Sequence, residues 1–172
     1  MDDAPLLDAK EILSVLVRHQ VRFVVIGALA ATIQGFPLRT EDLDILPDRA
    51  PQNLERLAEA LVELGSTEWD PHKGEFVERR FTGKMLASDS LWMLGTRYGR
   101  LDLVFEPAGA NGYKDLARRA RIYELEPGIQ VEVAALEDVI RSKEIAHRDK
   151  DRAQLGVLRK LLTEIERRRS KD

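Results

Sequence analysis

The sequence predicts one α/β (α+β) domain, in which helices flank a small mixed or antiparallel sheet and a helical segment closes the chain. The chain has 172 residues, enough for one hydrophobic core but not for two independent domains. Short apolar runs with strand character recur between stretches of helical periodicity. From residue 135 onward the pattern stays helical. We therefore expect a core over residues 1–134 and a C-terminal helical segment over residues 135–172 that packs on it.

The first elements are a helix, a strand and a second helix. Asp8, followed three residues later by Glu11, gives a capping-box pattern, and the apolar spacing behind it predicts a helix over residues 9–19. Residues 22–26, Arg-Phe-Val-Val-Ile, form a β-branched apolar run that is typical of a buried strand. A short helix is expected over residues 29–34, because a glycine follows directly and ends the pattern.

A half-buried strand and a long helix come next. In residues 42–46, Asp-Leu-Asp-Ile-Leu, polar and apolar side chains alternate, which predicts a strand with one buried face. Asp42 and Asp44 therefore point to the same side of that strand. Residues 51–64 predict an amphipathic helix that begins with proline, whereas residues 66–83 are polar and show no clear period.

The second half of the chain contains two predicted hairpins, each made of two short apolar runs joined by turn residues. The paired runs are 91–94 with 100–105, joined by the loop 95–99, and 122–125 with 129–133, joined by Pro127-Gly128. The remaining helical patterns cover residues 113–121 and 135–168, the latter as two helices hinged near Arg148 and Asp149.

Composition excludes several kinds of site. There is no cysteine, so a disulfide, a thiolate metal site and a Cys nucleophile are all impossible. The net charge of −3 does not indicate a general nucleic-acid binder. The N-terminus lacks the basic and apolar regions of a signal peptide, and no apolar run reaches the roughly 20 residues that span a bilayer. We therefore expect a soluble, cytoplasmic protein without a membrane partner.

Three aspartates are candidate metal ligands. Asp42 and Asp44 lie one residue apart on a strand, which puts both carboxylates on one face about 7 Å apart at the backbone. Asp102 lies in a second predicted strand among apolar neighbours, where a carboxylate needs a cation or hydrogen-bond partners. Hard oxygen ligands of this kind suit Mg²⁺ or Mn²⁺. The alternative is a solvated strand face for the first two and an exposed edge position for Asp102.

A glycine turn precedes this strand. Gly27-Ala28 ends the run at residues 22–26 and opens the next helix, where backbone N–H groups and the helix dipole favour phosphate. An acidic metal site and a phosphate-binding turn are thus predicted close together in the chain.

These segments resemble a known superfamily. Val-Val-Ile-Gly-Ala at residues 24–28, followed by Asp-Leu-Asp-Ile at residues 42–45, resembles the nucleotidyltransferase signature of the DNA polymerase β superfamily. Arg-Thr-Glu-Asp-Leu-Asp at residues 39–44 is similar to bacterial nucleotidyltransferases of the abortive-infection and toxin–antitoxin type. Gly-Arg-Leu-Asp-Leu-Val at residues 99–104 matches the strand that supplies their third carboxylate. Residues 136–151 resemble their helical motif, a lysine followed by Arg-x-Lys-Asp.

The resemblance implies a metal-dependent transfer of a nucleoside monophosphate from a nucleoside triphosphate (NTP) to an acceptor, with release of pyrophosphate. It implies that Asp42 and Asp44 hold two Mg²⁺ or Mn²⁺ ions and that Asp102 completes the site and accepts the proton of the attacking hydroxyl. The nucleotide-binding residues implied in the same way are Gly27, Ala28, Arg39, Thr40 and Lys143. Serine or glycine is common in the superfamily where this chain has Ala28, so phosphate binding here falls to backbone N–H groups and cations.

Several functions remain open on the sequence alone. The first is a transferase acting on tRNA or a protein in a bacterial toxin–antitoxin or phage-defence system, with a cognate antitoxin as a further partner. The second is a nucleotidyltransferase that modifies a small molecule such as an antibiotic. An acidic cleft beside the metals would favour a cationic drug, and a basic one would favour RNA. The third is a non-catalytic binding module or antitoxin with the same fold, and the last is a structural protein with a solvated acidic strand.

Overall fold

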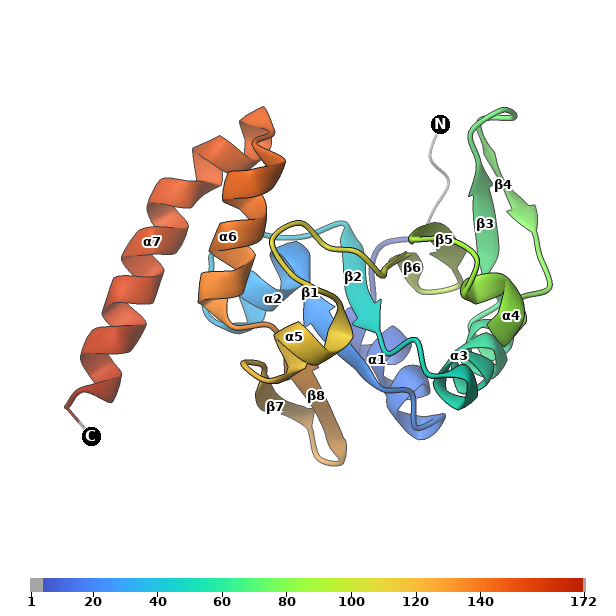
Figure 1. The fold of residues 1–172 in the computed structure, drawn as a ribbon, viewed down its shortest axis with the longest axis horizontal. Helices are drawn as coiled ribbons and strands as arrows, with labels where there is room; N and C mark the ends of the chain where they lie inside the picture. Colours follow the sequence, from blue (N-terminus) through green and yellow to red (C-terminus); the bar gives the residue numbers. More distant parts are fainter. Residues whose placement is uncertain (1–4, 172) are drawn as a thin grey trace.

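The computed structural model describes residues 5–171, in which strands and helices form one sheet with helices around it (Figure 1). The strands are β1 (Phe23–Ile26), β2 (Asp42–Pro47), β3 (Thr67–Asp70), β4 (Glu75–Glu78), β5 (Leu91–Thr96), β6 (Gly99–Val104), β7 (Arg121–Glu126) and β8 (Ile129–Val133). The helices are α1 (Ala9–Arg18), α2 (Gly27–Ile33), α3 (Pro51–Glu63), α4 (Gly83–Leu86), α5 (Tyr113–Ala117), α6 (Leu136–Ala146) and α7 (Asp149–Arg169).

Within the described residues the sheet has eight strands in the order β4-β3-β5-β6-β2-β1-β8-β7. At its centre β2 pairs in parallel with β6 and antiparallel with β1, and β1 pairs in parallel with β8. The outer pairs β3–β4, β5–β6 and β7–β8 are antiparallel hairpins. The sheet is mixed, and the predicted α/β class is confirmed.

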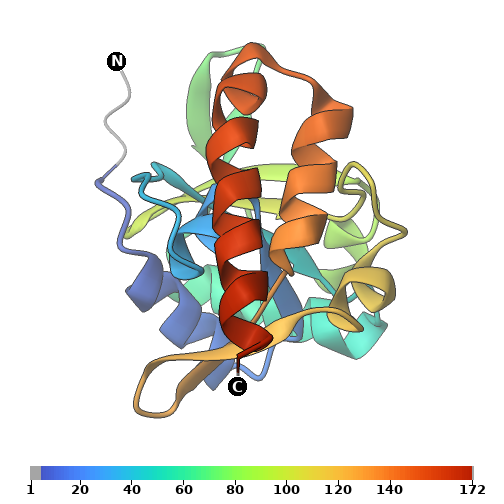
Figure 2. The same ribbon diagram turned by 90° about the vertical axis from the view of Figure 1, so that its left-hand side faces the viewer.

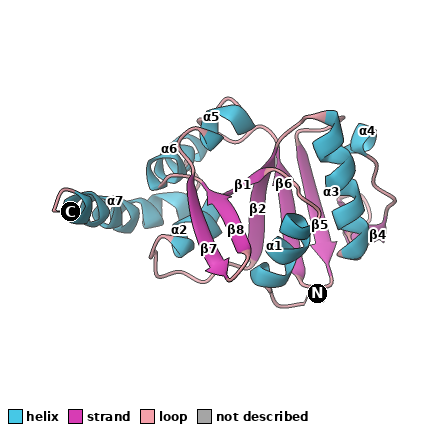
Figure 3. Ribbon diagram, turned by 90° about the horizontal axis from the view of Figure 1, so that it is seen from below, coloured by secondary structure: helices cyan, strands magenta, loops and turns pink. Residues whose placement is uncertain are grey.

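The hydrophobic core lies largely on the face of the sheet opposite the three aspartates. Leu43, Leu101 and Leu103, which alternate with these aspartates, are fully buried. Helices α1 and α3 lie side by side there, on the viewer's side of Figure 3, and the side chain of Asp8 caps α1 by accepting from the N–H of Glu11. Because one face of β2 and β6 is buried in this way, the polar side chains that alternate with the buried leucines must point to the opposite face of the sheet.

The polar stretch 66–83 forms a hairpin and a short helix, which the sequence left unassigned. The side chains of Trp69 and Phe76 meet across β3 and β4, with ring centroids 5.1 Å apart. The other residues of these strands are mostly charged and partly exposed, because the hairpin lies at the sheet edge, so no strong apolar alternation marks it.

The hairpin between β5 and β6 is tighter than predicted. Its loop contains two residues rather than the five of residues 95–99, since Thr96 pairs with Gly99. The Thr96 hydroxyl donates to the carbonyl of Gly99 at 2.8 Å and accepts from the N–H of Tyr98 at 3.0 Å. Gly99 has φ of +111°, a backbone conformation that favours glycine, and this residue lets the turn close.

Helices α6 and α7 run antiparallel beside each other (Figure 2). Their turn contains His147, whose φ is +54°, and Arg148, at the predicted hinge. Among the described residues, no helix combines the length and the apolar character that a membrane crossing requires.

Candidate metal centre

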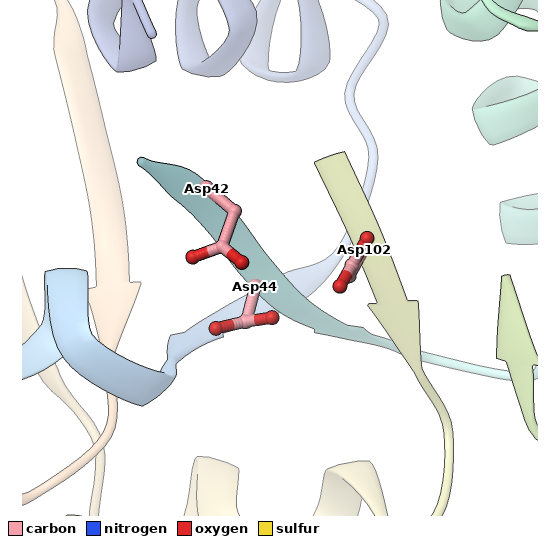
Figure 4. Close-up of side chains that lie close together, drawn as sticks. All are labelled: Asp42, Asp44 and Asp102. Carbon is pink, nitrogen blue, oxygen red and sulfur yellow. The ribbon is translucent and has the colours of Figure 1, made fainter. Parts of the chain in front are cut away.

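Two neighbouring strands bring the three aspartates together. Because β2 and β6 pair in parallel with Asp44 opposite Asp102, the carboxyl groups of Asp42, Asp44 and Asp102 project from one face of the sheet (Figure 4). Each aspartate contributes one carboxylate oxygen to the cluster, and these three oxygens all lie within 4.8 Å of one another. The predicted acidic cluster therefore exists as a compact geometric site.

The electrostatics of this cluster are unfavourable without a cation. Burial, together with the charges of Asp42 and Asp102, raises the pKa of Asp44 to about 7. Burial and the charge of Asp42 also raise the pKa of Asp102 to about 6, against the opposing charge of Arg100. Carboxylates held this close cannot all ionise without mutual repulsion. A bound divalent cation would remove that repulsion.

The residues fit a divalent metal. Asp102 Oδ1 is buried and accepts no hydrogen bond from the described residues, so it needs a partner of another kind. The donor set consists of carboxylate oxygens, which Mg²⁺ and Mn²⁺ prefer. The orphaned oxygen and the donor chemistry thus agree, and the metal would be held by Asp42, Asp44 and Asp102.

Thr40 and Gly27 set the positions of these aspartates. The Thr40 hydroxyl lies 2.8 Å from the carbonyl oxygen of Asp42 and 3.2 Å from its Oδ1, so it orients the first aspartate. Gly27 has φ of +67°, and a Cβ added there would lie 2.3 Å from Asp44 Oδ2. Only a residue without a side chain leaves the Asp44 carboxylate in its place.

The Gly27→Ala variant is expected to lose about 1–2 kcal/mol of unfolding free energy, because alanine is strained at positive φ. It should also bind Mn²⁺ about tenfold more weakly, since the new methyl group displaces the Asp44 carboxylate. Denaturant unfolding and Mn²⁺ titration measure the two effects. Gly156→Ala on α7 is the matched control: its Cβ meets open space, and we expect a gain of about 0.5–1 kcal/mol and unchanged Mn²⁺ binding. Unchanged Mn²⁺ affinity in Gly27→Ala would contradict this role of Gly27.

The three aspartates line a cleft of about 590 Å³. This volume is in the range of small-molecule and cofactor sites. The cleft runs between the sheet, the loop that follows β6, helix α6 and the start of α7. The three aspartates share its lining with the predicted nucleotide-binding residues Gly27, Ala28, Arg39, Thr40 and Lys143. Arg39 is exposed at its wall.

Lys143 reaches the cleft wall in a buried ion pair. Its Nζ donates to Asp151 Oδ1 at 3.0 Å, and Asp151, which is fully buried, also accepts from Arg148 Nε at 2.6 Å. Burial works to raise the pKa of Asp151, but the hydrogen bonds from Arg148 and Lys143 outweigh it and hold that pKa below its usual range. This network fastens the start of α7 to α6.

Two cations at the α6–α7 turn were not assigned to the site by sequence reasoning. Arg148 and Lys150 both line the cleft, and their positive charges act on Asp44 and partly oppose the rise in its pKa. The signal for them lay in the Arg-x-Lys-Asp motif, but helical spacing alone does not show that the turn leans over the aspartates.

No protein-family model and no curated protein sequence matches this chain. Solved structures share its fold. TM1012 of Thermotoga maritima, a proposed nucleotidyltransferase, superimposes with a TM-score of 0.54 at 19% identity, over 91% of each chain. The lincosamide antibiotic adenylyltransferase LnuA, solved with lincomycin bound, superimposes with a TM-score of 0.58 at 15% identity, over 91% of this chain and 99% of LnuA. At these identities the likeness shows the fold alone, which is that of nucleotidyltransferases.

Proposed function

We propose that the protein is a metal-dependent nucleotidyltransferase, which moves a nucleoside monophosphate from an NTP to an acceptor hydroxyl. One observation carries the proposal: three carboxylates, one with an orphaned buried oxygen, lie close together in a cleft that is also lined by cations. A charge arrangement of this kind suits phosphoryl chemistry, which depends mainly on positioning and electrostatic stabilisation.

Each side of the cleft has its own role in this proposal. Mg²⁺ or Mn²⁺ at the aspartates would lower the pKa of the acceptor hydroxyl and offset the charge of the triphosphate. Arg39, Arg148 and Lys150 are the candidate partners of the triphosphate and of the leaving pyrophosphate, because they line the same cleft. Lys143 adds its charge to the cleft wall while it holds Asp151.

The reaction forms a bond between the acceptor oxygen and the α-phosphorus. The bond from the α-phosphorus to the oxygen that bridges to the β-phosphate breaks, and pyrophosphate leaves. A carboxylate of the acidic cluster, Asp102 in our assignment, accepts the hydroxyl proton.

Two acceptor classes are compatible with this chemistry. The sequence resemblance favours tRNA or a protein, in a bacterial toxin–antitoxin or phage-defence system with a cognate antitoxin. A small molecule such as an antibiotic is the second candidate, and one observation supports it: LnuA, an antibiotic adenylyltransferase, matches almost its whole length to this fold.

The test is transfer of label from NTPs carrying ³²P at either the α or the γ position, with Mg²⁺ or Mn²⁺, and with tRNA or cell lysate as acceptor. We expect α-label, but not γ-label, on the acceptor, and none with the Asp42→Asn/Asp44→Asn variant. Transfer of γ-label would indicate a kinase instead. No transfer, together with no metal-dependent NTP binding, would favour the non-catalytic binding module.

A further inference from the structure

The face of the sheet that carries the acidic cluster continues beyond it onto the outer strands. In the antiparallel ladder of β5 and β6, Met93 pairs with Asp102 and Leu91 pairs with Val104, so these side chains share the face of the site. Leu91 and Val104 also line the cleft. The apolar surface is thus continuous with the acidic cluster.

The β3–β4 hairpin extends this face. Gly95 lies two residues from Met93 and pairs with Thr67 on β3, which puts Trp69 and its partner Phe76 on the same face. A Cβ added at Gly95 would lie 3.2 Å from the Phe76 ring, which confirms that the ring lies over this face. In Figure 1 the hairpin stands on one side of the sheet centre and the α6–α7 turn on the other.

The part of this face that lies over β3, β4 and β5 is less covered by other side chains than the opposite face of the sheet. Leu91 is 48% exposed, whereas the neighbouring Trp92, which points to the other face, is 6% exposed. Met93 and Trp69 are also partly exposed. Apolar side chains left open beside a cleft commonly mark a ligand surface.

The charges here do not suit a polyanion. Among the described side chains that strand pairing puts on this outer face, Arg100 carries a positive charge, while Glu78 and Asp102 are acidic. Nucleic acids bind through several Lys or Arg side chains along their phosphates. Of the cations that line the cleft, Arg148 and Lys150 lie at the α6–α7 turn, where we place the triphosphate, while Lys143 lies on α6 and Arg39 precedes β2.

We infer that the outer sheet face is the acceptor site, and that the acceptor is a small hydroxyl compound with an apolar body and no phosphate groups. Its apolar body packs on Leu91, Met93 and the Trp69–Phe76 pair, and its hydroxyl lies beside Asp102. This inference rests on the proposed function and names the acceptor class that it leaves open.

The test supplies α-³²P-labelled NTPs and Mn²⁺ to the full chain with two acceptor pools, total tRNA and an ultrafiltrate of bacterial lysate that contains small molecules but no RNA or protein. We expect label on a small compound of the ultrafiltrate. Leu91→Lys and Trp69→Ala should each lower that labelling about tenfold, because each removes one apolar contact. Ile122→Lys, at a still more exposed strand position on β7 at the far edge of the sheet, should leave it unchanged.

The outcomes separate this inference from the proposed function. If the wild-type protein binds Mn²⁺–NTP but labels tRNA alone, or labels neither pool, the acceptor assignment is wrong. Equal labelling by wild type, Leu91→Lys and Trp69→Ala would also overturn it. If the wild-type protein does not bind Mn²⁺–NTP at all, the proposed function itself fails. Circular dichroism of each variant shows that the comparison is made between folded proteins.

Discussion

The Asp44→Asn variant is expected to lose nucleotide transfer and yet to be more stable than the unchanged protein when no metal is present and the pH is above 7. Transfer should fall by at least about a hundredfold, because the substitution removes a central metal ligand. The gain in stability has a different cause, which is the charge that Asp44 carries in a buried acidic cluster.

The sign follows from proton binding. Burial raises the pKa of Asp44 from 3.8 to about 7 in the folded protein, so between these pH values the folded state binds more protons than the unfolded chain. The free energy of unfolding of the metal-free protein therefore falls as the pH rises from about 4 to about 7. Each pKa unit corresponds to about 1.4 kcal/mol, and neighbouring charges share the effect, so Asp44→Asn should gain about 1–3 kcal/mol at pH 8.

Denaturant unfolding at pH 5 and pH 8, with a chelator and then with Mn²⁺, measures this prediction. We expect the advantage of Asp44→Asn to be present at pH 8, to shrink at pH 5 and to reverse when Mn²⁺ stabilises the wild type. Asp149→Asn is the matched control, because that aspartate is 92% exposed at its side chain and lies outside the cluster. A variant that is less stable than wild type at pH 8 without metal would show that Asp44 is not under electrostatic strain.

The Asp151→Ala variant is expected to show the largest loss of stability, about 3–5 kcal/mol. Asp151 is fully buried and accepts hydrogen bonds from Lys143 and Arg148, so its removal leaves the largely buried ammonium of Lys143 without its counter-charge. The start of α7 would then lose its attachment to α6, and Arg148 and Lys150 would lose their place over the cleft. Transfer should fall as well, even at temperatures where the variant stays folded.

Thermal and denaturant unfolding of Asp151→Ala, with Asp149→Ala as control, checks this prediction. The exposed pair of Asp149 with Arg152 is expected to contribute less than about 1 kcal/mol. The pH dependence has the opposite sign to that of Asp44. Because hydrogen bonds from Arg148 and Lys143 hold the pKa of Asp151 below its usual range despite burial, this stabilisation is present at neutral pH and is lost as the pH falls through the acid range. A loss below about 1 kcal/mol in Asp151→Ala would contradict the role of the network.

The sequence predicted the central part of the fold well because its strands and helices carry strong local patterns. The alternation in residues 42–46 places Asp42 and Asp44 on one face, and one face of that strand is indeed buried. The hairpin of β3 and β4 was not predicted, since its strands are short, lie at an edge and contain four charged residues against three apolar ones. Alternation of polar and apolar residues is weak in a strand that is not packed against another element, because neither of its faces is buried.

The site was predictable only in part, for a similar reason. The three aspartates could be named from strand pattern and resemblance, but their distance depends on the parallel pairing of β2 with β6, which no local pattern encodes. The same holds for Lys150 and Asp151, whose roles depend on how the α6–α7 turn folds over the cleft. The Gly27 requirement is also tertiary, because it arises from the Asp44 carboxylate on the neighbouring strand.

The most direct test of the central claim is Mn²⁺ binding by electron paramagnetic resonance, with and without an ATP analogue that carries a methylene group between its α- and β-phosphates. This measurement needs no acceptor. We predict that the wild-type protein binds Mn²⁺, that the analogue tightens this binding, and that both effects are lost in Asp44→Asn but kept in Asp149→Asn. Equal binding by wild type and Asp44→Asn, or no Mn²⁺ binding with the analogue present, would contradict the account.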